Sequence, residues 1–173
     1  QSPSSILIKM LFNDLKSSEN QTTYFKTMLY PLNLSRLVVI CTRETASASE
    51  VVINGLRPYL NVVLVGDTTN GKPTGMNVWT YPGTVPKYVY APVTFKLVNK
   101  DNFGDFYTGL PPQKLADDDI KHNWGDPAEA SFSQAVYYME NGTFGAKGSY
   151  TGKRVQYFRE RPGLMNNAYI INR

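Results

Sequence analysis

The sequence predicts an α/β fold with a mixed βαβ core and a β-hairpin extension. Two apolar runs of strand length, Leu37–Cys41 and Asn61–Gly66, flank a helical pattern that starts near Ala48. Two aromatic stretches are separated by Pro82-Gly83, which is typical of a hairpin. With 173 residues, of which 42% are hydrophobic, the chain can bury one core, so we expect a single domain.

The other elements follow from periodicity and from the positions of glycine and proline. A predicted helix, a polar link and a short amphipathic stretch precede the core. A polar loop follows the hairpin, and the last predicted helix would hold Pro127 in its first turn and end at Asn141-Gly142. In chain order, the predictions are a helix over 6–15, a link over 16–23, the amphipathic stretch over 24–30, a helix over 48–60, strands over 76–81 and 87–98, a loop over 101–126 and a helix over 127–140.

The predicted core brings two loops to the same edge of the sheet. Thr45–Glu50 lies between the first strand and the helix, so Ser47 is expected at a helix N-terminus. The helix would return along the sheet, and Asn61–Gly66 would then run parallel to the first strand. The exit loop, Asp67–Lys72, would face Ser47 again, at the carboxyl ends of the strands, where open α/β sheets bind ligands. We therefore expect Lys72 within reach of Ser47.

Ser47 and Lys72 have the chemistry of a nucleophile and a base. A serine hydroxyl is a weak nucleophile at neutral pH, and Ser-Lys pairs are one known way to remove its proton. Each residue also has a purely structural interpretation. Ser47 with Glu50 three residues later forms a capping box, and a lysine after glycine in a loop is usually a solvated charge. The two features together favour catalysis.

Two segments, Thr45–Glu50 and Val65–Lys72, resemble the signature of the C-terminal processing peptidases, also called tail-specific proteases, a family of serine peptidases with a Ser-Lys dyad. The family pattern is roughly G-T/S-A-S-A-S-E followed by V-G-x-x-T-x-G-K. The resemblance covers about residues 36–140 and includes Gly109–Pro112 and Trp124–Pro127, which are similar to the family's G-F-x-P and G-D-P segments. Three positions depart from the family pattern, namely Glu44, Pro73 and Gln113.

This resemblance implies that Ser47 is the nucleophile, that Lys72 is the general base and that Glu50 orients the lysine or its loop. It also implies a ClpP/crotonase-like core. The backbone N–H of Ala48, at the N-terminus of the helix, would be one oxyanion donor. The family takes a second donor from an upstream N-x-G-G-like turn that does not precede Ser47 in this sequence. We therefore expect half of the oxyanion hole to be missing and this chain alone to be a weak or inactive peptidase.

The resemblance further implies that residues 1–140 are the C-terminal portion of a peptidase catalytic domain. The expected partners are a protein or peptide substrate and the N-terminal remainder of the same protein, including a PDZ domain. The chain begins with Gln1, which favours a processed product or an excised piece. No apolar run approaches the ~18 residues of a membrane-spanning helix, so we expect no transmembrane segment in this chain. By resemblance alone, the expected location is the bacterial cell envelope, periplasmic or exported.

Other reactive side chains predict no second site. Cys41 ends an apolar strand and has no second cysteine to pair with, which indicates a buried structural thiol. His122 is the one histidine available for a Ser-His-Asp triad, and its polar surroundings show no pattern for that role. The acidic run Asp117–Asp119 is expected to be solvated. We therefore expect no cofactor and no metal.

The net charge of +4 is concentrated in residues 141–173, a basic Gly-rich tail, packed or flexible, with six basic side chains against one acidic. Such a tail could attract nucleic acid or an anionic membrane. Its aromatic residues do not follow the pattern of an RNA-binding module, so we expect no nucleic-acid partner. Three functions remain open: a serine endopeptidase that cleaves unfolded proteins or peptides near their C-terminus, a non-catalytic peptide- or ligand-binding relative, and a basic binding module that acts through the tail.

Overall fold

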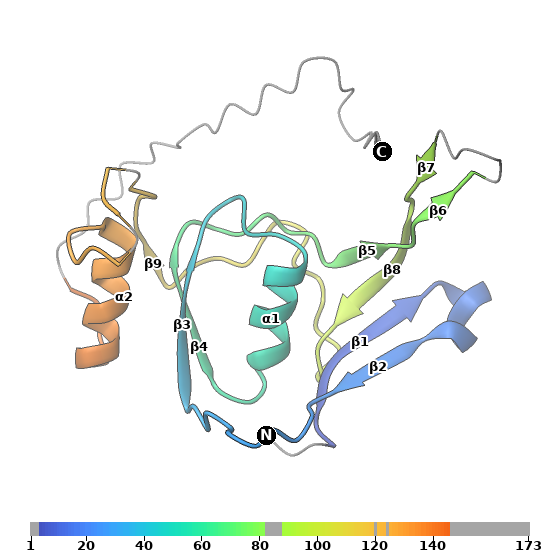
Figure 1. The fold of residues 1–173 in the computed structure, drawn as a ribbon, viewed down its shortest axis with the longest axis horizontal. Coiled ribbons are helices and arrows are strands. Elements are labelled where there is room, and N and C mark those ends of the chain that lie inside the picture. Colours follow the sequence, from blue (N-terminus) through green and yellow to red (C-terminus); the bar gives the residue numbers. More distant parts are fainter. Residues whose placement is uncertain (1–3, 82–87, 120, 124, 146–173) are drawn as a thin grey trace.

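The computed structural model describes residues 4–81, 88–119, 121–123 and 125–145. In these ranges the strands form a four-stranded antiparallel sheet in the order β2-β1-β8-β5, a three-stranded parallel sheet in the order β3-β4-β9, and a two-stranded ribbon, β6-β7 (Figure 1). The elements are β1 Ile6–Phe12, the 3-10 helix η1 Asp14–Glu19, β2 Gln21–Tyr24, β3 Arg36–Cys41, α1 Ala48–Leu56, β4 Asn61–Gly66, β5 Thr74–Met76, β6 Trp79–Thr80, β7 Val89–Tyr90, β8 Val93–Val98, β9 Lys114–Leu115 and α2 Ala130–Asn141.

The predicted βαβ core is confirmed. β3 and β4 pair in parallel without a register shift, from Arg36 opposite Asn61 to Cys41 opposite Gly66. α1 connects them, as a parallel pair requires. β4 also pairs in parallel with β9, a strand of two residues within the stretch that the sequence predicts to be only loop. A strand this short leaves no periodic signal in a polar segment.

The two helices pack on the parallel sheet through separate clusters. Ile53 of α1 is buried with Leu64 of β4. Ala135 of α2 is buried with Val65, the next residue of β4, whose side chain points to the opposite face. α1 and α2 therefore cover opposite faces, which explains why β3 and β4 are continuous apolar runs rather than alternating ones.

α1 also packs against the antiparallel sheet, where a glycine allows close approach. A Cβ added at Gly55 would lie 2.8 Å from the carbonyl oxygen of Leu7 in β1, so a side chain there would push the helix away. The helix ends at Leu56, earlier than the predicted residue 60. Pro58 accounts for the difference, because it has no N–H to continue the helix and its ring would meet the carbonyl of Asn54.

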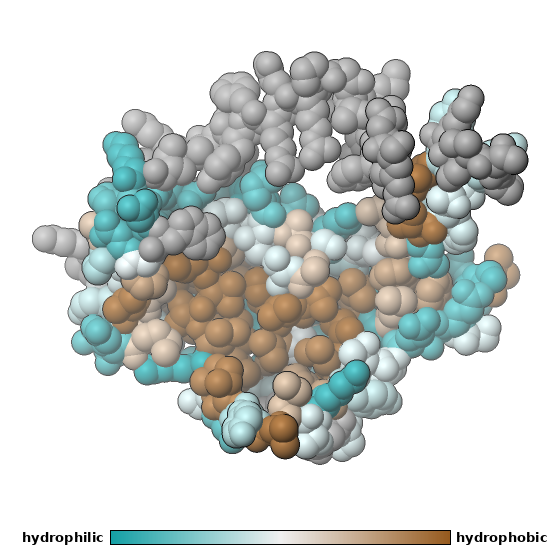
Figure 2. Space-filling model, in the orientation of Figure 1, coloured by the Kyte–Doolittle hydropathy of each residue, from teal (hydrophilic) through white to brown (hydrophobic). Residues whose placement is uncertain are grey.

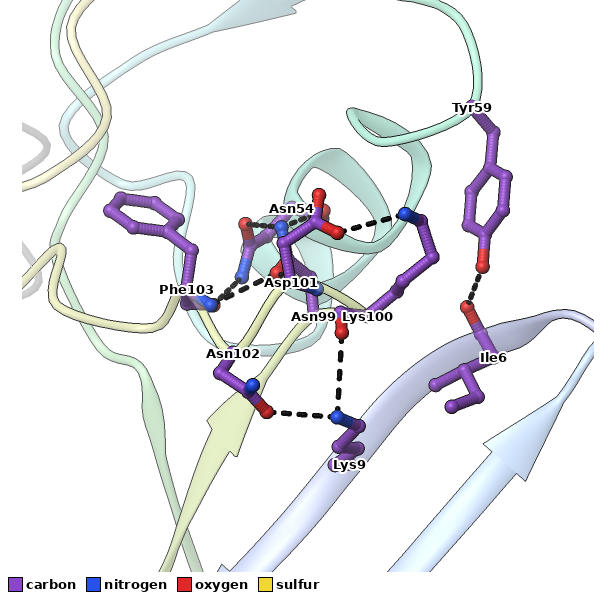
Figure 3. Close-up of polar contacts among 9 residues, drawn as sticks. All are labelled: Ile6, Lys9, Asn54, Tyr59, Asn99, Lys100, Asp101, Asn102 and Phe103. Atoms are coloured by element: carbon purple, nitrogen blue, oxygen red, sulfur yellow. Dashed lines mark hydrogen bonds and ion pairs between the residues drawn. The ribbon is translucent and has the colours of Figure 1, made fainter.

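A buried polar network fixes the second turn of α1 to the chain after β8 (Figure 3). Asn54 is 1% exposed and donates from Nδ2 to the carbonyl oxygen of Phe103 at 2.9 Å. Asn99 Nδ2 donates in turn to Asn54 Oδ1 at 3.1 Å, and its Oδ1 accepts the N–H groups of Asp101 and Phe103 at 3.0 Å each. These bonds satisfy amides that would be costly to bury unpaired. They fix the position of α1, the helix whose N-cap residue is Ser47.

The helix predicted over residues 6–15 is wrong: Ile6–Phe12 is strand β1, flanked by β2 and β8. Ile6 and Ile8 are β-branched and suit a strand, and pairing on both sides decides the conformation of a run that also fits a helix. The predicted polar link contains most of η1 and most of β2. The amphipathic stretch predicted over 24–30 begins with the last residue of β2 and has no helix.

The predicted hairpin strands are each interrupted. The first becomes β5 and β6, and the second becomes β7 and β8, which are separated by Ala91 and Pro92. Proline has no N–H for the ladder, which accounts for the break at Pro92, whereas the break between β5 and β6 contains no proline. Pro82-Gly83, Lys87, Trp124 and residues 146–173 of the predicted tail lie outside the described residues.

The last helix, α2, begins three residues after Pro127, so the predicted first-turn position of this proline is wrong. Glu129 caps the helix instead, because its carboxylate accepts the N–H groups of Ser131 and Phe132. Gly142, in a left-handed conformation, follows the last residue, as predicted. Across the described residues, no helix combines the length and apolar character needed to cross a membrane.

Candidate active site

Ser47 occupies a strained turn between β3 and α1. It is the N-cap residue of α1, with φ 52° and ψ −112°. An N-cap residue normally has a negative φ in the β region, and this ψ also lies outside the left-handed helical region open to some non-glycine residues. Strain of this kind costs roughly 1–3 kcal/mol and is concentrated at functional sites. A strained strand-to-helix turn is also the way in which α/β-hydrolases expose a serine nucleophile.

This strain predicts the effect of a glycine at position 47. Ser47→Gly should be more stable than Ser47→Ala by about 1–2 kcal/mol. Glycine adopts a positive φ without a steric cost, whereas alanine retains the Cβ that causes this cost. Urea unfolding of both variants measures the difference. Equal stability, or a more stable alanine variant, would show that the turn is unstrained.

Glu50 is fully buried, at 0% exposure, in the first turn of α1. Its Oε2 accepts the N–H of Ser47 at 2.9 Å, which is one half of the predicted capping box. Its other contacts reach a different part of the chain. Capping therefore explains only one of the hydrogen bonds that this carboxylate makes.

The second loop, Thr69–Lys72, provides the remaining donors. Glu50 Oε1 accepts the hydroxyl of Thr69 at 2.6 Å and the N–H of Gly71 at 2.7 Å, and Oε2 accepts the N–H of Lys72 at 2.8 Å. The backbone nitrogens of Ser47 and Lys72 thus bind the same oxygen atom. One buried carboxylate joins the two loops that follow β3 and β4. Figure 1 shows these loops at the same edge of the parallel sheet.

Thr69 is a further member of this site that the sequence did not reveal. It is fully buried, its hydroxyl accepts the N–H of Leu110 at 2.8 Å, and its own N–H donates to the carbonyl of Leu110 at 3.1 Å. Leu110 belongs to Gly109–Pro112, a segment noted only for its resemblance. The one available signal was the threonine of the motif V-G-x-x-T-x-G-K, which by itself indicates no partner.

Gly71 allows the Lys72 loop to approach the segment before Leu110. Its φ is +90°, and an added Cβ would lie 2.4 Å from the carbonyl oxygen of Tyr107. Gly71→Ala should therefore lower the free energy of unfolding by about 2 kcal/mol or more. Gly145→Ala is the matched control, since a Cβ at Gly145 would make contacts of 3.5 Å. Chemical denaturation measures both, and equal losses would contradict the close approach seen here.

The structure brings Ser47 and Lys72 together through their backbone. In the part of the chain that is described, no hydrogen bond joins Ser47 Oγ to Lys72 Nζ, and the side-chain dyad stays a prediction. Such contacts often tighten only when substrate binds. Ala48 is the first residue of α1, and the N–H groups of a first helical turn have no acceptor within the helix. Its use as an oxyanion donor likewise stays a prediction.

The hydrogen bonds described for the other reactive groups do not involve Ser47, Glu50 or Lys72. Cys41 is buried, as predicted, and burial raises the pKa of its thiol to about 12, with the Asp67 carboxylate adding to the effect. Its thiol therefore stays protonated at neutral pH.

His122 Nδ1 lies 2.5 Å from Asp119 Oδ2. Two hydrogen bonds lower the pKa of Asp119. The larger effect comes from the Lys121 N–H and the smaller one from the His122 side chain. No group of three metal-ligating side chains gathers among the described residues.

The model of a family described as Peptidase family S41 matches residues 7–101, more than half of this chain. The match includes Ser47, Glu50 and Lys72, and it ends before Gly109–Pro112. No curated protein matches the sequence significantly.

The solved structures that resemble this fold include two proteases. One is a protein named as a candidate S41 protease from Bacteroides fragilis, with a TM-score of 0.71, 27% identity, and alignment over 80% of this chain and 37% of that one. The other is a photosystem II D1 C-terminal processing protease, with a TM-score of 0.51, 20% identity, and alignment over 67% of this chain and 28% of that one. This chain thus spans about a third of the length of these structures.

Proposed function

Because this chain belongs to peptidase family S41, we propose that it contributes a Ser-Lys dyad, Ser47 with Lys72, to a serine endopeptidase. The observation that carries the proposal is the Glu50 carboxylate, which binds the backbone of both residues at once while Ser47 is held at a positive φ. A buried acceptor with four donors is far more than a helix cap needs. It serves to keep two loops in one geometry.

The reaction proceeds by acyl transfer. Ser47 Oγ attacks the carbonyl carbon of the scissile peptide, and the neutral amine of Lys72 takes the hydroxyl proton. The C–N bond then breaks, the lysine proton passes to the leaving amine, and Ser47 carries the acyl group as an ester. A water molecule, deprotonated by Lys72, attacks the ester and releases the new carboxyl terminus, after which Ser47 regains its proton.

The negative charge on the tetrahedral intermediate needs hydrogen-bond donors. The Ala48 N–H supplies one, at the positive end of the α1 dipole. We assign the second donor to an upstream turn in the N-terminal remainder of the protein. The same remainder would include the PDZ domain. This assignment is supported by the fact that this chain spans only 37% and 28% of the two similar structures. Residues 1–140 would then be the C-terminal portion of the catalytic domain, with a ClpP/crotonase-like core around β3, α1 and β4, and residues 141–173 would be a basic Gly-rich tail, packed or flexible.

The proposed substrates are unfolded proteins or peptides that are cut near their C-terminus. The motif resemblance supports this, and one similar structure is named as a C-terminal processing protease. The same resemblance supports a proposed location in the bacterial cell envelope, periplasmic or exported. A non-catalytic, peptide-binding role is the alternative, and it differs in predicting binding without cleavage.

Cleavage of a denatured protein by the whole protein tests this function. A reduced, carboxymethylated protein and its folded form are incubated with the enzyme, and mass spectrometry identifies the products. We expect the unfolded form to be cut, with the first cuts near its C-terminus, and the folded form to survive. An enzyme that binds the unfolded protein but never shortens it would instead be the non-catalytic relative.

A further inference from the structure

The β6–β7 ribbon places four aromatic side chains on one face. Trp79 lies opposite Tyr90 in the antiparallel register, and the Tyr81 N–H donates to the carbonyl of Tyr88 at 3.2 Å, which makes these two residues the next pair. Side chains two residues apart on a strand share a face, so both pairs lie on the same side. We call this side the aromatic face, comprising Trp79, Tyr81, Tyr88 and Tyr90. The opposite side carries Thr80 and Val89.

The aromatic face is exposed. Its four residues are 46%, 70%, 72% and 66% exposed, in chain order, and the rings of Trp79 and Tyr90 lie 5.9 Å apart between centroids. A two-stranded ribbon is only marginally stable by itself and gains nothing from leaving large rings in water. An exposed aromatic surface of this kind marks an interaction site.

The ribbon continues directly from the candidate active site. β5 begins two residues after Lys72 and leads to β6, so that Figure 1 shows β5 running from the sheet edge with the site toward the ribbon. β5 is also an edge strand: it pairs with β8 on one side, and no described strand pairs with its other side. A polypeptide in extended form can add to such an edge through its backbone.

We propose that the aromatic face binds the extended polypeptide substrate. Its rings pack against bulky apolar or proline side chains of the substrate, at a distance from the scissile bond. Tryptophan and tyrosine rings give large contact areas at a small entropic cost, and tyrosine hydroxyls reach backbone carbonyls. Aromatic surfaces bind proline-rich and extended peptides in other proteins. The inference rests on the proposed peptidase function. It selects a polypeptide rather than a sugar or a lipid surface, because the face continues from the proposed peptidase site.

Binding in a background without cleavage tests this inference separately from the proposed function. All variants carry Ser47→Ala in the whole protein, and the probe is a fluorescein-labelled, reduced and carboxymethylated α-lactalbumin, followed by fluorescence anisotropy. Removing the central pair with Trp79→Ala and Tyr90→Ala should raise Kd about 10-fold or more. Thr80→Ala on the opposite side should leave Kd within about 2-fold.

Two further variants keep the test decisive if the double substitution disturbs the ribbon. Tyr88→Ser alone, at a 72% exposed position, should raise Kd by about 5-fold, and Trp79→Phe should keep most of the affinity, because the ring remains. Unchanged affinity in Tyr88→Ser and in the double variant would overturn the inference. It would also be overturned if these variants lost binding only to anionic phospholipid vesicles or to a soluble glucan. A wild type that cleaves nothing would refute the peptidase proposal and leave this result standing.

Discussion

Replacing Ser47 with alanine is expected to reduce kcat of the whole protein on an unfolded substrate by on the order of 10⁴-fold or more, because the nucleophile is lost. Lys72→Ala should have an effect of the same size, since no other base would then take the hydroxyl proton. Lys72→Arg should fail as well, because a guanidinium stays protonated and cannot accept a proton. Steady-state cleavage of a quenched fluorescent substrate measures all three variants.

Ser49→Ala is the matched control for these variants. Ser49 lies two residues beyond Ser47, in the first turn of α1, and is exposed. Its removal should change kcat by less than about 2-fold, because its side chain takes no part in the proposed reaction. Robust cleavage by Ser47→Ala, or a loss in Ser49→Ala equal to that in Ser47→Ala, would mean that a different group is the nucleophile.

Substitution of Glu50 should have the largest effect on stability. Each of its oxygens accepts two hydrogen bonds, so a glutamine at this position turns an amide group toward donors whichever way it is placed. Each buried donor left unpaired costs about 1–3 kcal/mol. We expect Glu50→Gln to lose about 2–4 kcal/mol of unfolding free energy, and Glu50→Ala to lose more, because all four donors are left unpaired.

Glu44→Gln is the control for Glu50, because Glu44 is exposed in the same turn before α1. Its unfolding free energy should change by less than about 0.5 kcal/mol. Urea denaturation gives the stabilities, and kcat measured well below the unfolding midpoint separates positioning from stability. If Glu50→Gln kept both its stability and its kcat, the carboxylate would not hold the two loops together.

The βαβ core was predictable because its evidence is local. Leu37–Cys41 and Asn61–Gly66 are apolar runs of strand length with a helical pattern between them, and the parallel pairing follows from that order. The N-terminal strand was not predictable in the same way. Ile6–Phe12 fits either a strand or a helix, and the choice depends on β8, more than 80 positions away along the chain.

The candidate site also combines features that are visible in the local sequence with features that depend on distant segments. Ser47, Glu50 and Lys72 could be selected from motif and spacing, because they lie in two short segments that match a family pattern in the right order. The positive φ of Ser47 has no signature in a serine, and the link from Glu50 to Thr69 and on to Leu110 joins three distant segments. Pairwise hydrogen bonds of this kind are set by the tertiary fold. A single sequence does not encode them in any local pattern.

The most direct test of the account is a double-mutant cycle between Ser47 and Lys72 in the whole protein. The rate of cleavage of an unfolded substrate is measured for wild type, Ser47→Ala, Lys72→Ala and the double variant. If the two residues act as one catalytic unit, the double variant should be no slower than either single variant, because the unit is already lost with one member. Losses that multiply in the double variant would show that Ser47 and Lys72 act independently, and would contradict the dyad.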